Sequence, residues 1–304
     1  MVNLSVYRFT LVNKVKEQQV LSFYNEEEDL LETMNDFCSH IHMNVKKYTD
    51  IQGKLRTFSL ANFQSLDSNK RIITCSVDSA YTGENGKIID SVTKKLKCDI
   101  YKRDLFSKKF FCCIHVPKNS KFGFLIVEKK ENHGVKQVFE NSFNEFMRLK
   151  GVSSYSLQLK QAPPRYLIKQ FLEHGKLKEF RLIDGSFSAE VETMDFSLGK
   201  EERIFKQIGS TSIGKELKEA LVKLFKSSPS IDEKIPFLSE GSFDEISFVL
   251  EYERVSKTFY VKRQEKIRSN VDVTNFINFE DGEATFESLI RISLELINSA
   301  AYNL

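Results

Sequence analysis

Apolar and polar residues alternate along much of this chain, and the alternation starts near its first residue. Apolar side chains recur at close to every second position over Leu4–Val12, which predicts a β-strand. The same period returns in short runs between residues 54 and 130, separated by turn sequences such as Thr82–Gly86. Strands joined by short turns pair with their neighbours, so these runs predict an antiparallel meander. The predicted strands are Leu55–Leu60, Arg71–Tyr81, Lys87–Val92, Lys97–Arg103, Lys108–Val116 and Phe122–Lys130.

Other segments carry apolar residues at helical spacing. Asn25 is a suitable N-cap, and Glu28 stands at the capping-box position three residues later, so a helix is predicted to begin here. Further helices are predicted over Val135–Leu149, from Pro164 to Glu173, over Lys215–Lys226 and from about Ala284 onward. The whole pattern predicts an α+β fold, in which antiparallel sheets are partly covered by about four amphipathic helices.

A chain of 304 residues suits one large domain or two ordinary ones. Gly151 follows a predicted helix, and the pair Pro163–Pro164 starts the next. We therefore predict an N-terminal α+β half over residues 1–151 and a C-terminal α+β half over residues 152–304, with a single intertwined domain as the alternative. The second half contains a predicted hairpin of Glu245–Arg254 and Lys257–Arg263.

Composition indicates a folded protein of a reducing compartment. The 26 phenylalanines and the absence of tryptophan predict a core built from Phe, which an AT-rich genome explains without any role in base stacking. The five cysteines form no CxxC pair, and their odd number is typical of reduced thiols. The N-terminal sequence has no signal-peptide pattern, and no apolar run approaches the roughly 20 residues of a membrane span. We expect a cytoplasmic protein without a membrane partner.

The chain lacks the motifs of the common cofactor enzymes. It contains no GxxxxGK[ST] phosphate loop, no GxGxxG after a strand and no GxSxG. Cys38 and His42 have the i, i+4 spacing of two metal ligands, but no second pair at zinc spacing accompanies them. No cofactor and no resident metal are therefore expected.

One short motif suggests metal-dependent chemistry. Glu128 and Lys130 end an apolar strand and match the (D/E)xK half of the PD-(D/E)xK nuclease pattern, with Asp104 or Asp99 as the second carboxylate. Two carboxylates would hold Mg²⁺ against a phosphate while the lysine steadies the attacking water. The same letters are also the ordinary end of a strand in solvent, and a convincing Pro-Asp pair is missing.

Basic residues gather in two runs. Between Lys94 and Lys121 nine basic residues stand against two acidic ones, a formal charge of +7, and between Arg254 and Arg268 six stand against one, a charge of +5. Basic strands interleaved with aromatic residues suit phosphates and bases, although lysines also protect sheet edges from aggregation. The residues predicted to contact nucleic acid are Lys94, Lys95, Lys97, Lys102, Arg103, Lys108, Lys109, Lys262 and Arg263.

Two hypotheses about function follow. The first is a non-catalytic binding or sensing protein that contacts a protein partner, a nucleic acid or both through basic surfaces, in a context such as a prokaryotic anti-phage defence or toxin locus. The second is a Mg²⁺-dependent nuclease that uses Asp104, Glu128 and Lys130. A homodimer is the usual expectation for symmetric assembly.

Overall fold

The fold is known from a computed structural model that describes residues 1–49, 55–82, 85–130, 134–184, 201–206, 212–227 and 244–301. Contacts divide the chain into two compact units. The first unit contains residues 1–160 and 270–298, and the second contains residues 161–269 and 299–304. We predicted a single boundary near Gly151, whereas the contacts divide the chain near Gln161 and again near Asn270. Residues 161–269 of the second unit are thus inserted between two segments of the first.

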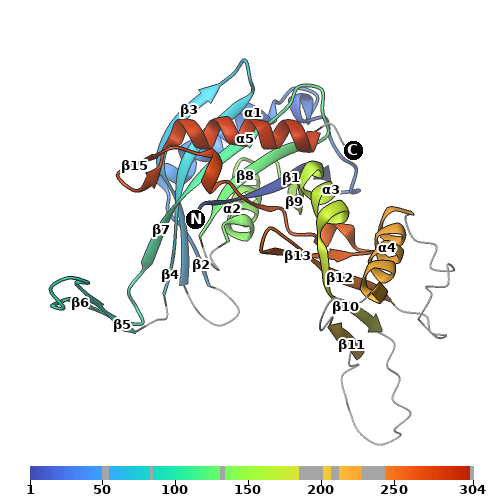
Figure 1. The fold of residues 1–304 in the computed structure, drawn as a ribbon. Helices are drawn as coiled ribbons and strands as arrows, with labels where there is room; N and C mark the ends of the chain where they lie inside the picture. The colour runs from blue at the N-terminus through green and yellow to red at the C-terminus, as the bar shows by residue number, and fades with distance from the viewer. Residues whose placement is uncertain are drawn as a thin grey trace, which may run out of the picture. The chain divides into compact units, whose positions relative to one another are not determined.

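The α+β class predicted from the sequence is confirmed, with antiparallel sheets and five α-helices in the described residues. The first unit is built on an eight-stranded sheet with the order β14-β1-β8-β7-β4-β3-β2, in which β9 also pairs with β1 (Figure 1). Every pairing along that order is antiparallel, as the meander prediction requires. The strands are β1 (Asn3–Asn13), β2 (Lys46–Thr49), β3 (Leu55–Asp67), β4 (Ile72–Tyr81), β7 (Phe106–His115), β8 (Gly123–Lys129), β9 (Tyr155–Gln161) and β14 (Asn270–Asp272).

Helices cover both faces of this sheet. Successive strand residues point to opposite faces of a sheet, so the side chains of Phe110 and Phe111 in β7 lie on different faces. Phe110 belongs to the buried cluster that contains the apolar side chains of α1 (Leu30–Met43) and α2 (Lys136–Leu149). Phe111 meets Phe286 of α5 (Phe286–Ala301) edge to face, with 5.1 Å between ring centroids. The first unit therefore has three layers, helix, sheet and helix (Figure 1).

The start of α1 corrects one prediction. The N-cap is Asp29, whose carboxylate accepts the Leu31 N–H at 2.8 Å, and not Asn25. Glu28 does not complete a capping box from Asn25, because its carboxylate accepts the hydroxyl proton of Tyr24. Arg71 donates from Nη1 and Nη2 to the two oxygens of Asp29 at 2.8 and 2.7 Å, and this contact fixes the cap from a distant part of the chain.

The second unit carries a four-stranded antiparallel sheet with the order β11-β10-β12-β13. Its strands are β10 (Lys176–Asp184), β11 (Glu201–Lys206), β12 (Glu245–Tyr252) and β13 (Val255–Tyr260), and its helices are α3 (Arg165–His174) and α4 (Ser212–Ser227). Phe248 and Phe259 stack on neighbouring strands at 5.3 Å, and Phe171 of α3 and Phe225 of α4 both pack against Phe259. Both helices thus cover the same face, and phenylalanine builds this core as predicted.

Short elements complete the structure. Three 3₁₀ helices are η1 (Leu21–Phe23), η2 (Gln264–Lys266) and η3 (Thr274–Phe276) in the described residues. Two small hairpins stand outside the sheets: β5 (Gly86–Ile89) with β6 (Leu96–Ile100), and β15 (Phe279–Glu280) with β16 (Glu283–Ala284). Within the described ranges, no helix has the length and apolar character that crossing a bilayer requires.

Candidate interaction surface

The connection between β4 and β7 carries a hairpin of its own, which we name the arm and define as residues 85–105. Tyr81 of β4 is in register with Phe106 of β7, and their rings meet edge to face at 5.9 Å where the long ribbon ends. Beyond that point β5 and β6 pair only with each other, from Gly86 opposite Ile100 to Ile89 opposite Leu96. The arm therefore extends the ribbon past the sheet (Figure 1).

A tight turn closes the tip of the arm. The Asp90 carboxylate accepts the N–H groups of Thr93 at 2.8 Å and Val92 at 3.0 Å, which is an Asx-type turn, and Lys94 adopts a left-handed φ of 58°. Lys97 Nζ lies 3.0 Å from the same carboxylate. The hydrogen bond from the Thr93 N–H has the largest effect on Asp90 and the contact with Lys97 the next largest, and together they lower the pKa of Asp90 to about 2. The tip is thus locally ordered.

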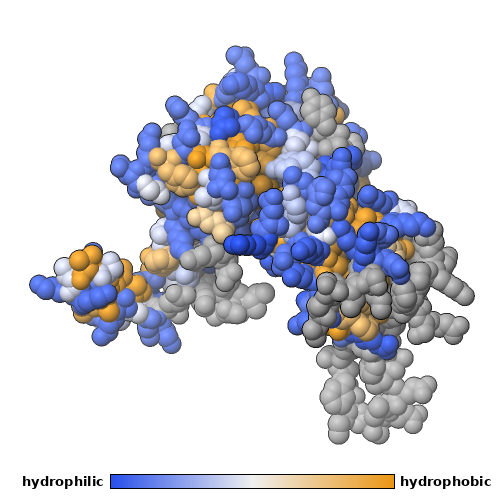
Figure 2. Space-filling model, in the orientation of Figure 1, coloured by the Kyte–Doolittle hydropathy of each residue, from blue (hydrophilic) through white to orange (hydrophobic). Residues whose placement is uncertain are grey.

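The arm has no core. Every residue of β5 is exposed, and in β6 only Ile100 is half-buried. Aliphatic side chains that a sheet would normally cover stay open to solvent, including Ile89 at 54%, Leu96 at 52% and Val92 at 86%. An isolated two-stranded hairpin is marginally stable in water, and exposed apolar patches mark interaction sites. Figure 2 shows hydrophobic (orange) and hydrophilic (blue) surface side by side on the arm.

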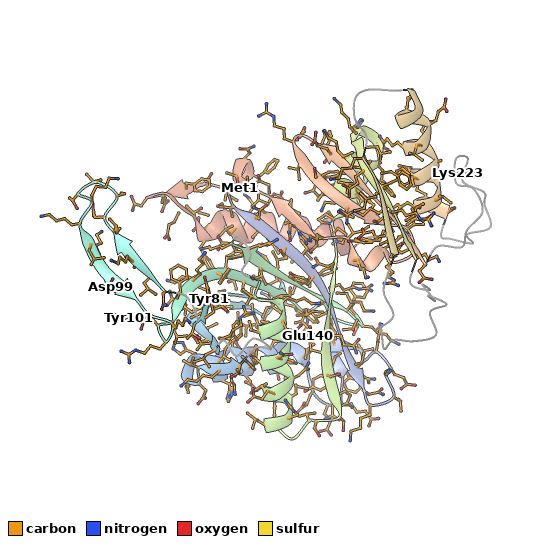
Figure 3. The ribbon with its side chains drawn as sticks, turned by 90° about the horizontal axis from the view of Figure 1, so that it is seen from below. Met1, Tyr81, Asp99, Tyr101, Glu140 and Lys223 are labelled. Carbon is orange, nitrogen blue, oxygen red and sulfur yellow. The ribbon has the colours of Figure 1, made fainter. Side chains whose placement is uncertain are left out.

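Five of the predicted nucleic-acid contacts lie on the arm. Lys94 and Lys95 occupy the tip, and Lys102 and Arg103 occupy the turn that follows Tyr101; all four are exposed. Lys97 is also exposed but paired with Asp90. Figure 3 labels Asp99 and Tyr101 on the arm and Tyr81 at the end of β4. The arm holds six basic and three acidic residues, a formal charge of +3.

Two more predicted contacts, Lys108 and Lys109, stand on β7 next to the arm. Lys108 Nζ lies 5.5 Å from the centroid of the Phe106 ring. Lys109 is in register with Asp78 on the neighbouring strand, a cross-strand pair of opposite charge. The structure thus brings seven of the nine predicted basic residues to the arm and its base.

The remaining two, Lys262 and Arg263, belong to the second unit. Their backbone N–H groups donate to the buried Glu245 carboxylate at 2.9 and 3.0 Å, and the Arg263 Nε atom lies 3.9 Å from Glu245 Oε2. The carboxylate also accepts the Ile246 N–H at 3.0 Å. Glu245 therefore holds the chain that leaves β13, and it partly neutralises Arg263.

The structure does not bring the predicted nuclease residues together. Lys130 Nζ and Glu128 Oε2 form an ion pair at 3.5 Å on one face, as the spacing indicates. Glu128 also accepts the Phe111 N–H at 3.2 Å. The five residue-to-residue steps from Phe111 to Phe106 cover about 17 Å at 3.3 Å each. Asp104 lies beyond them, where it accepts the Tyr101 N–H at 2.8 Å. Asp99 lies still further along, in β6.

Two carboxylates that share Mg²⁺ must both reach within about 2.1 Å of the ion. Neither Asp104 nor Asp99 meets that condition together with Glu128. The described residues contain no group of three or more His, Cys, Asp or Glu placed to hold a metal ion. The contacts of Glu128 are structural instead: it accepts a hydrogen bond from the neighbouring strand β7 and forms an ion pair with Lys130.

Sequence reasoning missed a second exposed surface, which we name the acidic hairpin and define as residues 272–287. It contains β15, β16 and η3, and its five carboxylates stand without any lysine or arginine. Phe276 is 61% exposed and Phe279 is 45% exposed on the same segment. The sequence did contain a signal for this acidic surface, because no basic residue occurs between Arg268 and Arg291.

Comparison with known proteins assigns this chain to no family and gives no function for the arm. No protein-family model matches the chain, and the search of curated proteins found no match.

Proposed function

We propose that this chain is a non-catalytic binding protein that docks onto a protein partner through the arm. One observation carries the proposal: the arm exposes a set of aliphatic side chains on a hairpin that has no core of its own. Basic residues at its tip and at its base flank those side chains. The combination favours an acidic partner surface with an apolar centre.

The energetics of the arm agree with this role. Full burial of a Val, Leu or Ile side chain is worth roughly 1.5–3 kcal/mol. Five aliphatic residues of the arm are exposed by 43% or more, so covering them contributes on the order of 5 kcal/mol. These residues are Ile88, Ile89, Val92, Leu96 and Leu105. Association costs a comparable amount, which the charged contacts help to offset.

A protein fits the arm better than a nucleic acid does. Lysine and arginine would suit phosphates, but Ile89, Val92 and Leu96 would gain little from a phosphate backbone. Only Tyr101 among the exposed arm residues offers a ring on which a base can stack. Nucleic-acid binding therefore stands as the competing outcome. The defence or toxin context stays a prediction, which unrelated neighbouring genes would contradict.

Site-specific crosslinking tests the proposal. A photoreactive phenylalanine analogue replaces Val92 at the tip of the arm, and in a matched variant it replaces Val15, which is 71% exposed in another turn of the first unit. Both proteins are irradiated in the cells that naturally make the chain. We expect a discrete protein adduct from position 92 and none from position 15. Equal adducts from both positions, no adduct, or an adduct with nucleic acid alone would overturn the proposal.

A further inference from the structure

We propose that the arm's partner is a second copy of this chain, and that the arm of each copy docks on the acidic hairpin of the other. This inference rests on the proposed function, since it names the partner of the same surface. It follows from the match between two exposed surfaces of the first unit. One is basic and aliphatic, and the other is acidic and aromatic.

The acidic hairpin is held firmly on the first unit. The Val273 N–H donates to the Val2 carbonyl at 2.9 Å, and Arg291 Nη2 donates to the Phe276 carbonyl at 2.6 Å. Phe286 at its end is packed against Phe111 of the sheet. A surface fixed at both ends loses little conformational entropy when a partner binds, so it is suited to act as the receiving side.

Its charge is not balanced locally. Glu280 and Glu283 lie directly opposite each other in the β15–β16 ladder, and like charges at such positions destabilise a hairpin. Both are exposed, as are Asp281 and Glu287. Among the described residues, none of these four carboxylates has an ion-pair partner within 4.0 Å. Basic groups brought by a partner would relieve this repulsion.

The arm supplies those groups. Lys94, Lys95, Lys102 and Arg103 are exposed, and in the described residues none of them has a carboxylate within ion-pair distance. The arm carries +3 and the acidic hairpin carries −5. The exposed rings of Phe276 and Phe279 offer an apolar surface to the aliphatic residues of the arm. Charge and apolar content therefore match on both sides.

The arrangement favours a reciprocal pair. Both surfaces belong to the first unit, and Figure 1 shows the β5–β6 arm and β15 toward the same side of that unit. A twofold axis between two such units would place each arm on the other copy's acidic hairpin. A twofold dimer uses the same patch on both copies and closes without further growth.

Complementary charge reversal tests the pairing. One variant carries Lys94→Glu and Lys95→Glu in the arm, and another carries Glu280→Lys and Glu283→Lys in the acidic hairpin. A control carries Lys14→Glu and Lys16→Glu, an equal charge change at exposed positions outside both surfaces. Sedimentation velocity measures the association state of each, and thermal unfolding verifies that each is folded.

We expect the unaltered chain and the control to be dimers, and each reversed variant alone to dissociate with a dissociation constant raised about tenfold or more. An equimolar mixture of the two reversed variants should form a dimer again, because both arm contacts then join opposite charges. A monomeric unaltered chain, a dimer that survives arm reversal, or a mixture that stays monomeric would overturn the pairing.

The two proposals fail in different ways. If the adduct formed from position 92 contains a different protein while the chain sediments as a monomer, the arm is a docking surface but its partner is not a second copy. If position 92 gives no adduct, the arm itself is not a docking surface.

Discussion

The side chain of Gln161 accepts two hydrogen bonds from Ser269, one from the backbone N–H at 3.0 Å and one from the hydroxyl at 2.5 Å. The two residues are separated by 108 positions and are the first and last of the 161–269 segment. Ser269 is fully buried. One amide side chain thus joins the two ends of the inserted segment.

Loss of this contact should destabilise the protein. Gln161→Ala removes the acceptor of both of these hydrogen bonds, and we expect the free energy of unfolding to fall by about 1–3 kcal/mol. A double-mutant cycle with Ser269→Ala, followed by denaturant unfolding, should give a coupling energy of the same order. Additive effects of the two substitutions would show that the bonds do not contribute jointly.

The Asp29–Arg71 pair predicts an acid-sensitive first unit. Burial opposes the charge of Asp29, but the hydrogen bonds from Arg71 outweigh it and lower the pKa of this carboxyl below 3.8. A group with a lowered folded-state pKa stabilises the fold above its unfolded pKa, and that contribution is lost as the pH falls through the folded value.

We expect Asp29→Ala to lower the free energy of unfolding by about 1–3 kcal/mol at pH 7. The loss should become smaller as the pH falls below 3.8, where Asp29 becomes protonated in the unfolded and then in the folded chain. The control is Asp36→Ala, since Asp36 is mostly exposed in its ion pair with Lys150 and should cost under about 0.5 kcal/mol. Chemical denaturation at several pH values measures both. Equal costs for the two variants would contradict the structural role of Asp29.

Lys257 predicts that the stability of the second unit also rises with pH, but at alkaline pH and because its buried charge destabilises the fold. Its ammonium donates to the Arg268 carbonyl at 2.6 Å and lies 5.9 Å from the Phe171 ring centroid. Burial lowers the pKa of Lys257 from 10.5 to about 8. Between pH 8 and 10.5 the unfolded chain binds more protons than the folded chain, so the free energy of unfolding rises with pH in this range. Below pH 8 Lys257 is charged in both states, and the fold bears the full cost of burying that charge.

Lys257→Met should therefore raise the free energy of unfolding at pH 7 by about 1–3 kcal/mol and flatten its rise between pH 8 and 10.5. Lys178→Met is the control, because Lys178 is half-exposed and pairs with Glu251. A destabilising Lys257→Met would mean that the bond to Arg268 outweighs the burial of the charge.

The arm should be dispensable for folding. Val92→Ser and Leu96→Ser remove apolar groups that already face water, so each should change the free energy of unfolding by less than about 0.5 kcal/mol. The same variants should abolish the crosslinked adduct when the photoreactive group stands at position 89. A large loss of stability would show that the arm packs against the body of the first unit.

A direct assay separates binding from nuclease chemistry. We expect no cleavage of plasmid, single-stranded DNA or RNA with Mg²⁺ or Mn²⁺, because Asp104 lies far from Glu128. Glu128→Ala should instead destabilise the chain by about 1–2 kcal/mol, since the Phe111 N–H loses its acceptor. Cleavage that disappears in Glu128→Ala and Lys130→Ala would restore the nuclease hypothesis.

Much of the fold was accessible from local pattern. The predicted strands and helices correspond to observed elements because alternation and helical spacing reflect which faces the layers cover, as in β1 and α2. Local pattern failed where a distant residue decides. The cap of α1 shifts to Asp29 because Arg71 binds there, and no local spacing reveals that contact. The pairing of β1 with β14 likewise joins Ser5 to Asn270.

The candidate surface was predicted in part. Charge counting located the lysines of the arm, and the structure places them in the open. The exposure of Ile89 and Leu96 was not predicted, because alternating apolar residues usually indicate a covered face. Whether such a strand lies inside the sheet or beyond it depends on where the β4–β7 pairing leaves the sheet. The alternation of apolar and polar residues does not indicate that position.

The place of the inserted segment has a consequence for synthesis on the ribosome. Strand β14 and most of helix α5 belong to the first unit but are translated only after residues 161–269 of the second unit. Until they emerge, Phe111 and its neighbours on that face of the sheet lack their cover, so a nascent chain of the first 160 residues exposes apolar surface. We expect chaperones to hold this face until β14 and α5 have emerged.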